Sequence, residues 1–335
     1  MMDEGSDTSE DRNTLQRIFT LNKASGWLWW FWLFFMDPRE EGGIPKQAAI
    51  LWSTKNDGGL RCNGKEMGVD HALRDDGSLH GGVAAWYFDG SSMQHEVLLD
   101  RVKIDLSDSG IETKSPDTAF RMVDGGFHVF MDRGMEFQAK VLDDAHEFVS
   151  PWEKDHKWLG YGYEMTGINR MCLSAKVDGE ATGGSCYFQK VLLGAPAVPW
   201  YWGIFHFGNG ASLTYFNPRI LGKSVKKDVS FYDGRELHRF SGIHVRKIDE
   251  DLPVFHVSAE EDGKSLEFSV EPYAKTVWKF RKKKWGFIPV RFDYGQFPAL
   301  IRRIRFEDGN NREELTEHDL GLGVGNAEDS RGALF

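Results

Sequence analysis

The chain has 335 residues and a formal net charge of -10, from 41 Lys and Arg against 51 Asp and Glu. This balance argues against a general nucleic-acid binder, because neutralising phosphates requires a basic surface over much of a domain. A hydrophobic content of 41% and an aromatic content of 13% allow a large core. The three cysteines lack the spacing of a disulfide framework or a thiolate zinc site, so the reducing cytoplasm is the expected location.

Acidic residues gather at the two ends of the chain. Residues 1–12 hold five acids and one base, and residues 306–335 hold eight acids and two bases. Such polar, charged segments favour disorder. We therefore predict a disordered acidic leader over residues 1–19 and a disordered acidic tail over residues 306–335.

One basic strip stands out between these ends, where residues 275–305 hold ten bases and one acid. Its densest part could dock on anionic lipid headgroups, with Trp278 and Trp285 at the interface. A solvated hairpin end is the alternative. The bases that could make this peripheral membrane contact are Lys279, Arg281, Lys282, Lys283 and Lys284.

In chain order, the first predicted element is Gly26–Met36, the most apolar stretch of the protein. It is too short for a spanning helix, which needs roughly 20 residues, and it follows an acidic leader instead of the basic start of a signal peptide. Four tryptophans and three phenylalanines in this run favour a β-strand.

The remaining signals are short strands separated by Gly, Asp and Asn turns. Strands are predicted at residues 45–54, 83–89, 96–106, 127–131, 135–142, 171–177, 212–216, 255–258, 266–270 and 276–281. Amphipathic helices are scarce. The fold class is therefore all-β and antiparallel, with closed barrels or sandwiches that remove edge strands.

An internal echo divides the chain. The aromatic stretch at residues 26–35 is repeated at residues 199–210, and each of the two stretches begins a series of strands and turns. Two similar domains follow, over residues 20–197 and 198–305, although aromatic strands could also recur by chance in a chain so rich in tryptophan. The glycine-rich stretch Gly321–Asn326 follows no predicted strand and opens no helix, so we expect a flexible tail there instead of a phosphate loop.

Four motifs resemble a known family: Trp29-Trp30-Phe31, Tyr161–Gly167, Gly183–Lys190 and Trp200–Leu213. Their order is similar to that in the two-domain, lipocalin-like proteins that include carotenoid 1,2-hydratases, fungal Diels-Alderases and AttH-type proteins. The resemblance covers about residues 25 to 300. It implies two lipocalin-like β units in tandem, with an aromatic cavity at or near their junction.

The resemblance also implies a cofactor-free hydratase or cyclase acting on a hydrophobic, isoprenoid- or polyene-like substrate. Two alternatives remain, a non-catalytic carrier of a lipid-like ligand and a structural module with aromatic side chains packed solid. An enzyme requires a proton donor and a polar partner facing one cavity. A carrier requires only an apolar pocket.

Polar residues within these motifs are the candidates for catalysis. Glu164 is the best-placed proton donor, since an apolar setting raises the pKa of a carboxyl group, and Asp89 is second. Lys190 stands where the resembling proteins carry acidic or His-rich residues, and it could hydrogen-bond a substrate carbonyl. His206 could act as a general base. The predicted ligand-binding residues are Trp29, Trp30, Tyr161, Tyr163, Tyr187, Gln189, Trp200 and Trp202; no cofactor and no metal are expected.

Overall fold

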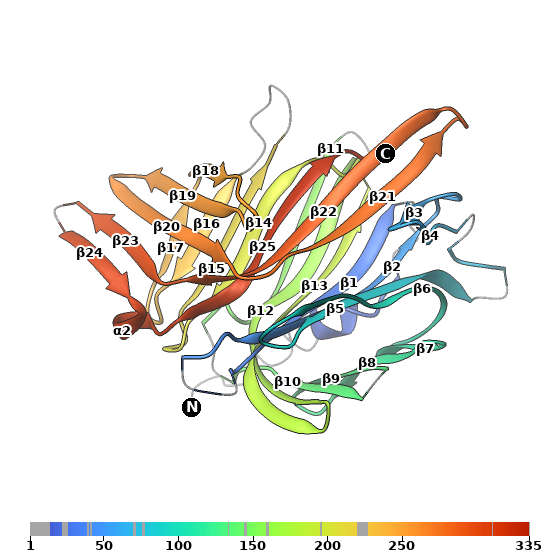
Figure 1. The fold of residues 1–335 in the computed structure, drawn as a ribbon, viewed down its shortest axis with the longest axis horizontal. Helices are drawn as coiled ribbons and strands as arrows, with labels where there is room; N and C mark the ends of the chain where they lie inside the picture. Colours follow the sequence, from blue (N-terminus) through green and yellow to red (C-terminus); the bar gives the residue numbers. More distant parts are fainter. Residues whose placement is uncertain are drawn as a thin grey trace, which may run out of the picture. The chain divides into compact units, whose positions relative to one another are not determined.

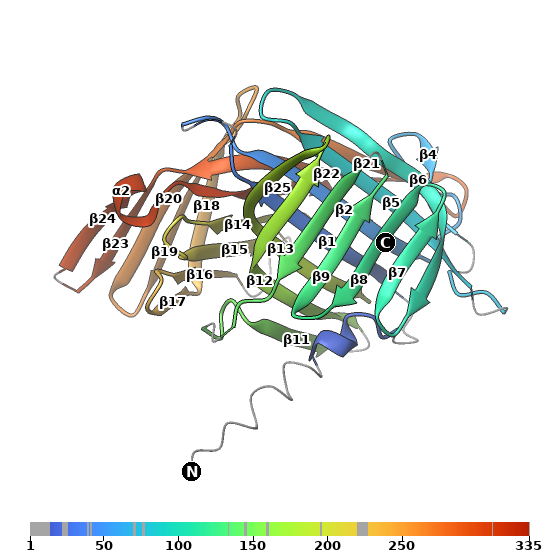
Figure 2. The same cartoon turned by 90° about the horizontal axis from the view of Figure 1, so that it is seen from below.

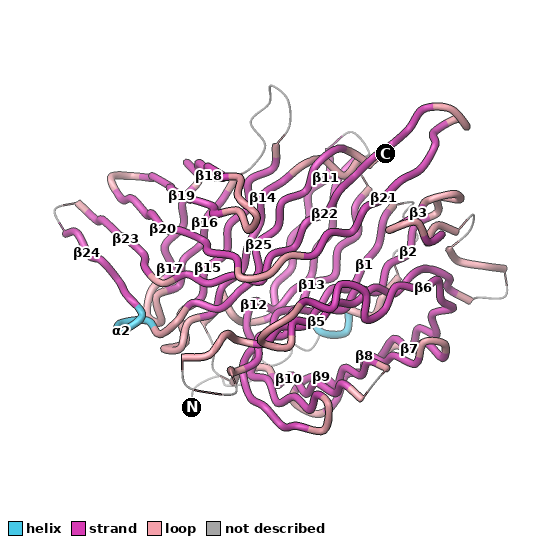
Figure 3. The backbone as a smooth tube through the Cα atoms, in the orientation of Figure 1, coloured by secondary structure: helices cyan, strands magenta, loops and turns pink. Residues whose placement is uncertain are grey.

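The protein is described from a computed structural model, which is built almost wholly of strands (Figure 3). The structure describes residues 14–21, 26–38, 40, 42–69, 72–75, 78–132, 134–143, 146–158, 161–194, 196–219, 227–309 and 311–334. Two compact units compose the chain: residues 1–90 with 94–196, and residues 91–93 with 197–335. Within these described ranges, no helix has the length and apolar character needed to cross a bilayer.

The first unit is a closed antiparallel barrel (Figures 1 and 2). Its sheet has the order β10-β9-β8-β7-β6-β5-β2-β1-β13-β12-β11, and a pairing of β10 with β12 closes ten of these strands into a ring. The two-stranded ribbon of β3 and β4 lies outside this sheet, within residues 1–90 of the same unit. The prediction of an all-β fold with a closed barrel is confirmed. The strands are β1 (Trp27–Met36), β2 (Lys46–Lys55), β3 (Arg61–Cys62), β4 (Lys65–Glu66), β5 (Leu79–Phe88), β6 (Met93–Ser107), β7 (Gly110–Lys114), β8 (Asp117–Val123), β9 (Gly126–Met131), β10 (Met135–Lys140), β11 (Pro151–Trp158), β12 (Tyr161–Val177) and β13 (Glu180–Leu193).

Aromatic side chains fill the centre of this barrel. Alternate residues of a strand point to the same face, so the even-numbered residues of β1 enter the core. The Trp32 ring centroid lies 4.8 Å from that of Phe188 and 5.1 Å from that of Phe120, and the rings of Phe34 and Phe137 stack at 3.9 Å. The apolar run is therefore a strand, as predicted, and its main task is core packing.

The segment before β1 belongs to the same core. Residues 14–17 form a helical turn, and both Ile18 and Phe19 are buried in the barrel. Trp30 on β1 donates from Nε1 to the main-chain oxygen of Ile18 at 2.7 Å. The predicted disordered leader is thus wrong for residues 14–19, because two apolar side chains anchor them; residues 1–13 lie outside the described residues.

Strand β12 changes its partner halfway along its length. Its first half pairs with β11 and its second half with β10, and the register with β13 shifts between Ile168 and Met171. Asn169 occupies this bulge, where its amide donates to the main-chain oxygen of Phe148 at 2.7 Å and accepts from Nε1 of Trp152 at 2.9 Å. The bulge bends β12, so that one strand both closes the barrel and carries an extra strand outside it.

The second unit is a curved antiparallel sheet with its own core. Its strand order is β17-β16-β15-β14-β25-β22-β20-β19-β18, with β21 on β22 and β23 between β20 and β24. Its elements are β14 (Trp200–His206), β15 (Ser212–Pro218), β16 (Asp228–Tyr232), β17 (Leu237–Phe240), β18 (Gly242–Ile248), β19 (Val254–Glu261), β20 (Lys264–Pro272), β21 (Thr276–Lys284), β22 (Ile288–Ile301), β23 (Arg303–Asp308), β24 (Asn311–Thr316), α2 (Glu317–Leu320) and β25 (Gly323–Gly332).

The predicted acidic tail is instead a structural part of this unit. β25 lies between β14 and β22; it pairs with β22 along its whole length and with β14 over residues 324–329. Gly323 and Gly325 lack side chains where a Cβ atom would come within 2.5 Å of the Phe207 ring and 2.0 Å of the Ile204 main-chain oxygen. The predictions of a disordered tail over residues 306–335, of a flexible Gly321–Asn326 stretch and of a domain end at residue 305 are therefore wrong, since these glycines allow close strand packing.

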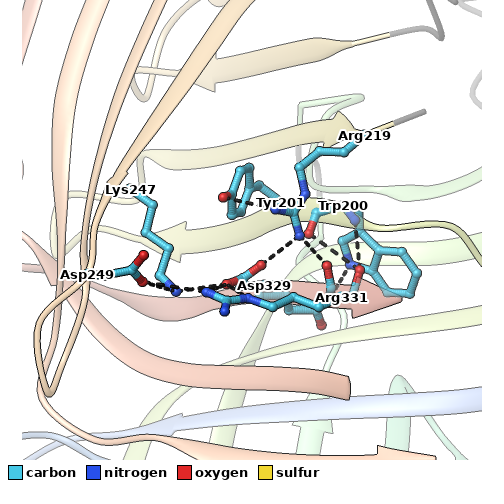
Figure 4. Close-up of polar contacts among 9 residues, drawn as sticks. Trp200, Tyr201, Arg219, Lys247, Asp249, Asp329 and Arg331 are labelled. Atoms are coloured by element: carbon cyan, nitrogen blue, oxygen red, sulfur yellow. Dashed lines mark hydrogen bonds and ion pairs between the residues drawn. The ribbon is translucent and has the colours of Figure 1, made fainter. Parts of the chain in front are cut away.

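A buried carboxylate on β25 gathers three cations (Figure 4). Asp329 is 4% exposed and accepts hydrogen bonds from Arg219 at 2.8 Å, Lys247 at 2.9 Å and Arg331 at 3.1 Å. The Arg219 guanidinium also lies 4.1 Å from the centre of the Tyr201 ring. This network joins β14, β18, β25 and the segment after β15 at one end of the core.

Replacing Asp329→Asn is expected to lower the free energy of unfolding by about 3 kcal/mol, because it removes the buried carboxylate that pairs with the buried Lys247 ammonium and the part-buried Arg219 guanidinium. The matched control is Asp308→Asn, which breaks an exposed pair with Lys264 at 2.7 Å and should cost at most about 1 kcal/mol. Urea denaturation measures both values. Equal losses in the two variants would contradict the prediction.

Candidate functional site

A pocket of about 390 Å³ lies in the first unit. It contains two of the three predicted catalytic residues, Glu164 and Lys190, together with apolar, hydroxyl and charged side chains. The pocket is lined by Arg17, Thr20, Leu28, Glu153, Lys154, Asp155, Glu164, Met165, Thr166, Lys190 and Leu192.

Strand register explains why these residues meet. Trp30, Lys190, Thr166 and Glu153 lie opposite one another across β1, β13, β12 and β11. A second row, two residues along, runs through Leu28, Leu192, Glu164 and Asp155. Because residues two apart share a face, both rows point their side chains to one side of the sheet.

Lys190 is buried among the elements that cover the barrel. Only 9% of it is exposed, and it shares its strand face with the core residue Phe188. Its Nζ donates to the main-chain oxygens of Arg17 at 2.7 Å and Thr20 at 2.5 Å. The side chain thus fastens the segment before β1 onto the barrel.

Burial lowers the pKa of Lys190 to about 8, because removal from water disfavours the charged ammonium group. The carboxylates of Glu164 and Glu153 oppose this shift without cancelling it. An amine with this pKa can donate or accept a proton near neutral pH.

Two further features determine what the pocket can hold. Arg17 and Glu153 form an ion pair at 2.5 Å at its edge, while Leu28, Met165 and Leu192 supply apolar wall. A hydrophobic molecule with one polar end matches this lining. Among the described residues, no group of three or more His, Cys, Asp or Glu side chains is placed to hold a metal ion.

The predicted ligand-binding residues of the first unit lie elsewhere. Trp30 belongs to the barrel core, whereas Trp29 is one residue out of phase and lies on the other face, with its ring 5.4 Å from that of Trp27. Tyr187 and Gln189 also lie on that other face, where the Tyr187 hydroxyl donates to the Gln189 amide oxygen at 2.9 Å.

Tyr163 is likewise out of phase with Glu164, and no described contact places it in the pocket. Tyr161 begins β12, but its side chain lies outside the described residues. Both tyrosines occupy odd-numbered positions of β12, whereas Glu164 and the other pocket residues of its row occupy even-numbered ones. Their role in ligand binding stays a prediction.

The remaining predicted residues belong to the second unit. Trp200, Trp202 and His206 are all on β14 and share the face opposite the core of that unit, with His206 buried. Trp200 donates from Nε1 to Glu328 at 2.9 Å. The sequence prediction that these residues act with Glu164 and Lys190 stays a prediction.

Sequence reasoning missed Glu328. It lies on β25, is 3% exposed and accepts hydrogen bonds from the Tyr294 hydroxyl and the Trp200 indole. Burial raises its pKa to about 7, although both hydrogen bonds favour the ionised form. A carboxyl group with a raised pKa, the property expected of a catalytic acid, therefore lies in the segment predicted to be a tail. A signal was present, because Gly321, Gly323 and Gly325 repeat with the period of two that a strand requires.

Comparisons with known proteins support the fold. A solved structure of a candidate AttH protein from Nitrosomonas europaea matches with a TM-score of 0.58 and 12% identity, over 94% of this chain and 94% of that one. Kievitone hydratase from Nectria haematococca has a TM-score of 0.47 and 7% identity, over 95% and 91% of the two chains. No family model and no curated protein matches the chain. The chain thus shares a lipocalin-like fold with the AttH protein, and this similarity extends to the fold alone.

Lys190 should make stability depend on pH in the alkaline range. Between about pH 8 and 10.5 the folded protein loses a proton that the unfolded chain keeps, so stability rises with pH. Relative to Lys190→Met, the wild-type protein should gain up to about 3 kcal/mol across this range. Denaturation at several pH values measures the difference, with the exposed Lys140→Met as control; parallel profiles for wild type and Lys190→Met would contradict the assignment.

Glu328 should have the opposite effect at acid pH. Its folded pKa of about 7 exceeds the ordinary 4.5, so its stabilising contribution is complete below pH 4.5 and is lost as the pH rises to 7. Relative to Glu328→Gln, the wild-type protein should lose up to about 3 kcal/mol over this interval. The exposed Glu267→Gln is the control. A difference that stays constant with pH would show that Glu328 titrates normally.

Proposed function

We propose that this protein is a cofactor-free hydratase or cyclase that acts on a hydrophobic isoprenoid- or polyene-like substrate bearing a carbonyl group. The observation that carries the proposal is the pocket in which Lys190 and Glu164 meet beside an apolar wall. The fold shared with the AttH protein is compatible with the proposal and does not specify the reaction.

Lys190 is suited to polarise a carbonyl. An ammonium group has three N–H donors, and the main-chain oxygens of Arg17 and Thr20 accept two of them. The third N–H can donate to a substrate carbonyl oxygen, which draws electrons from a conjugated double bond and makes its far carbon electrophilic. The two main-chain bonds hold the ammonium in place before the substrate arrives.

Glu164 is suited to move the proton. In a hydration, the water oxygen bonds to the far carbon of the conjugated double bond, and Glu164 takes the proton that the water releases. That proton then returns to the carbon next to the carbonyl, so water is added and nothing else is consumed. In a cyclisation, carbonyl polarisation by Lys190 suffices, because the product is an isomer of the substrate.

A carrier is the second candidate. The same ammonium would pair with the carboxylate of a lipid-like ligand, and Leu28, Met165 and Leu192 would contact its chain. The densely packed aromatic barrel centre favours a ligand that enters only this pocket over one that threads the barrel.

The test uses conjugated polyene aldehydes, ketones and acids incubated with the protein in water. Mass spectrometry distinguishes a hydrated product, which is heavier than the substrate by one water molecule, from a cyclised isomer, which has the mass of the substrate. Lys190→Met and Glu164→Gln should each lower kcat/KM for hydration by about a hundredfold or more, the usual contribution of an acid or base. Lys140→Gln on β10 is the charge-matched control and should leave the rate unchanged.

The outcomes separate the two candidates. If the wild-type protein binds a ligand without converting it and Lys190→Met weakens that binding, the protein is a carrier. If both pocket variants convert the substrate at the wild-type rate, the pocket has no role in the reaction.

A further inference from the structure

The hairpin of β21 and β22 ends in a strongly exposed aromatic pair. Trp285 is 74% exposed and Phe287 is 73% exposed, and Ile288 beside them is 39% exposed. β22 pairs with β25 only from Phe292 onward, so the end of the hairpin extends past β25 (Figure 1). Large apolar side chains grouped on a surface mark an interaction site.

The turn itself does not explain the choice of Trp285. The chain reverses over Lys284–Phe287, where the Phe287 N–H donates to the Lys284 oxygen at 3.3 Å. Trp285 has a φ of 53° and Gly286 a φ of 81°. Such a turn favours Asn or Gly at its first central position, and a bulky side chain is strained there. A tryptophan at this position therefore points to a use for its exposed ring.

Basic residues line one face of the same hairpin. Lys279, Lys283 and Arg291 are exposed on it, and Arg281 lies directly opposite Arg291 across the two strands. Like charges placed opposite each other destabilise a strand pair. The ion pair of Arg281 with Asp293, at 2.5 Å, relieves this repulsion only in part, since it supplies the face with one acid.

The other face of the hairpin is apolar near the sheet, where Trp278 and Phe280 are buried. Toward the tip an open depression of about 500 Å³ lies beside Trp285, and Pro289 and Val290 form part of its wall. The hairpin thus ends in apolar side chains, and the basic side chains of Lys279, Lys283 and Arg291, which we call the basic collar, lie nearer to the sheet. We use "hairpin tip" for Lys284–Ile288.

We propose that the hairpin tip docks on a bilayer of anionic phospholipid. Trp285 and Phe287 would enter the interfacial layer, where aromatic rings are favoured, and Lys279, Lys283 and Arg291 would face the phosphate and carboxylate headgroups. Charge complementarity selects this partner, because the tip combines apolar rings with a basic collar and the lipid surface combines an apolar layer with negative headgroups. The inference is independent of the reaction proposed for the pocket.

Vesicle sedimentation tests the docking with the full chain. The protein should sediment with vesicles of phosphatidylcholine containing phosphatidylserine, at least tenfold more than with pure phosphatidylcholine vesicles, and added salt should weaken this binding. Dibromo-phosphatidylcholine in the anionic vesicles should quench tryptophan fluorescence. This quenching should be smaller when Trp285 is replaced.

Two variants separate the apolar and the charged contributions. The double variant Trp285→Asn/Phe287→Ser should bind anionic vesicles at least tenfold more weakly, with an equal or higher Tm, because Asn accepts the left-handed conformation. The triple variant Lys279→Gln/Lys283→Gln/Arg291→Gln should lose most of the preference for phosphatidylserine and most of its salt dependence, since Lys282 and Lys284 keep their charges.

The matched control is Val123→Ser, which removes an exposed apolar side chain from the last residue of β8. It should bind vesicles like the wild-type protein. The proposal is overturned if the wild-type protein does not sediment with anionic vesicles or if it binds both lipid mixtures equally. It is also overturned if the Trp285→Asn/Phe287→Ser variant binds anionic vesicles as strongly as the wild-type protein.

Discussion

The bulge between Ile168 and Met171 in β12 determines where the first unit can carry a site. Without it, β12 would continue along one partner, and β10 and β11 would compete for the same edge. With it, β10 closes the barrel on one half of β12, while β11 pairs with the other half and brings Glu153 beside Thr166. The pocket forms along the first half of β12, the half that pairs with β11, where the sheet is wider than the closed ring. Asn169 stabilises the arrangement because both ends of its amide are bonded within the bulge.

Strand β25 has the corresponding role in the second unit. It supplies the central strand between β14 and β22, and it carries Glu328 on one face and Asp329 on the other. Burying two adjacent acids is costly, and the fold meets this cost differently on each face. Asp329 is surrounded by cations that balance its charge, whereas the hydrogen bonds of Glu328 come from neutral donors, and burial raises the pKa of Glu328 to about 7. Because successive side chains of a strand point to opposite faces, the two adjacent carboxyl groups have different neighbours: cations around Asp329 and neutral donors around Glu328.

The sequence predicted the strands that consist of a run of apolar residues bounded by turn residues. β1, β2 and β9 combine apolar runs with clear turns, and their predicted ranges agree with the observed ones to within one residue, whereas the prediction at 83–89 misses the first four residues of β5. Prediction failed for β25, whose buried residues are largely Gly, Asn, Glu, Asp and Ser. Such residues favour loops in isolation, and only the neighbouring rings of Phe205 and Phe207 make glycine the residue that fits.

The site was predictable in part for the same physical reason. Glu164 and Lys190 could be selected as polar residues in aromatic strands, but their meeting depends on the register of β12 against β13, which no local pattern specifies. Tyr187 and Gln189, the odd-numbered candidates on β13, lie on the opposite strand face from Lys190, and their role in ligand binding stays a prediction. Trp30, assigned to a ligand, instead bonds Ile18, because a segment predicted to be disordered supplies its acceptor.

Lys190 and Glu328 share one property that bears on why they are kept. Each is buried with a pKa moved toward neutrality, the base downward and the acid upward, so each holds its charge at a cost near pH 7. A methionine or leucine of similar size would avoid that cost, since replacing buried charged groups by apolar ones is often neutral or stabilising. Lys190 has a structural use in fastening Arg17 and Thr20, but neutral donors could serve those carbonyls equally well. What a neutral donor could not provide is a positively charged N–H aimed at a substrate carbonyl, and this is the property that the proposed reaction needs from Lys190.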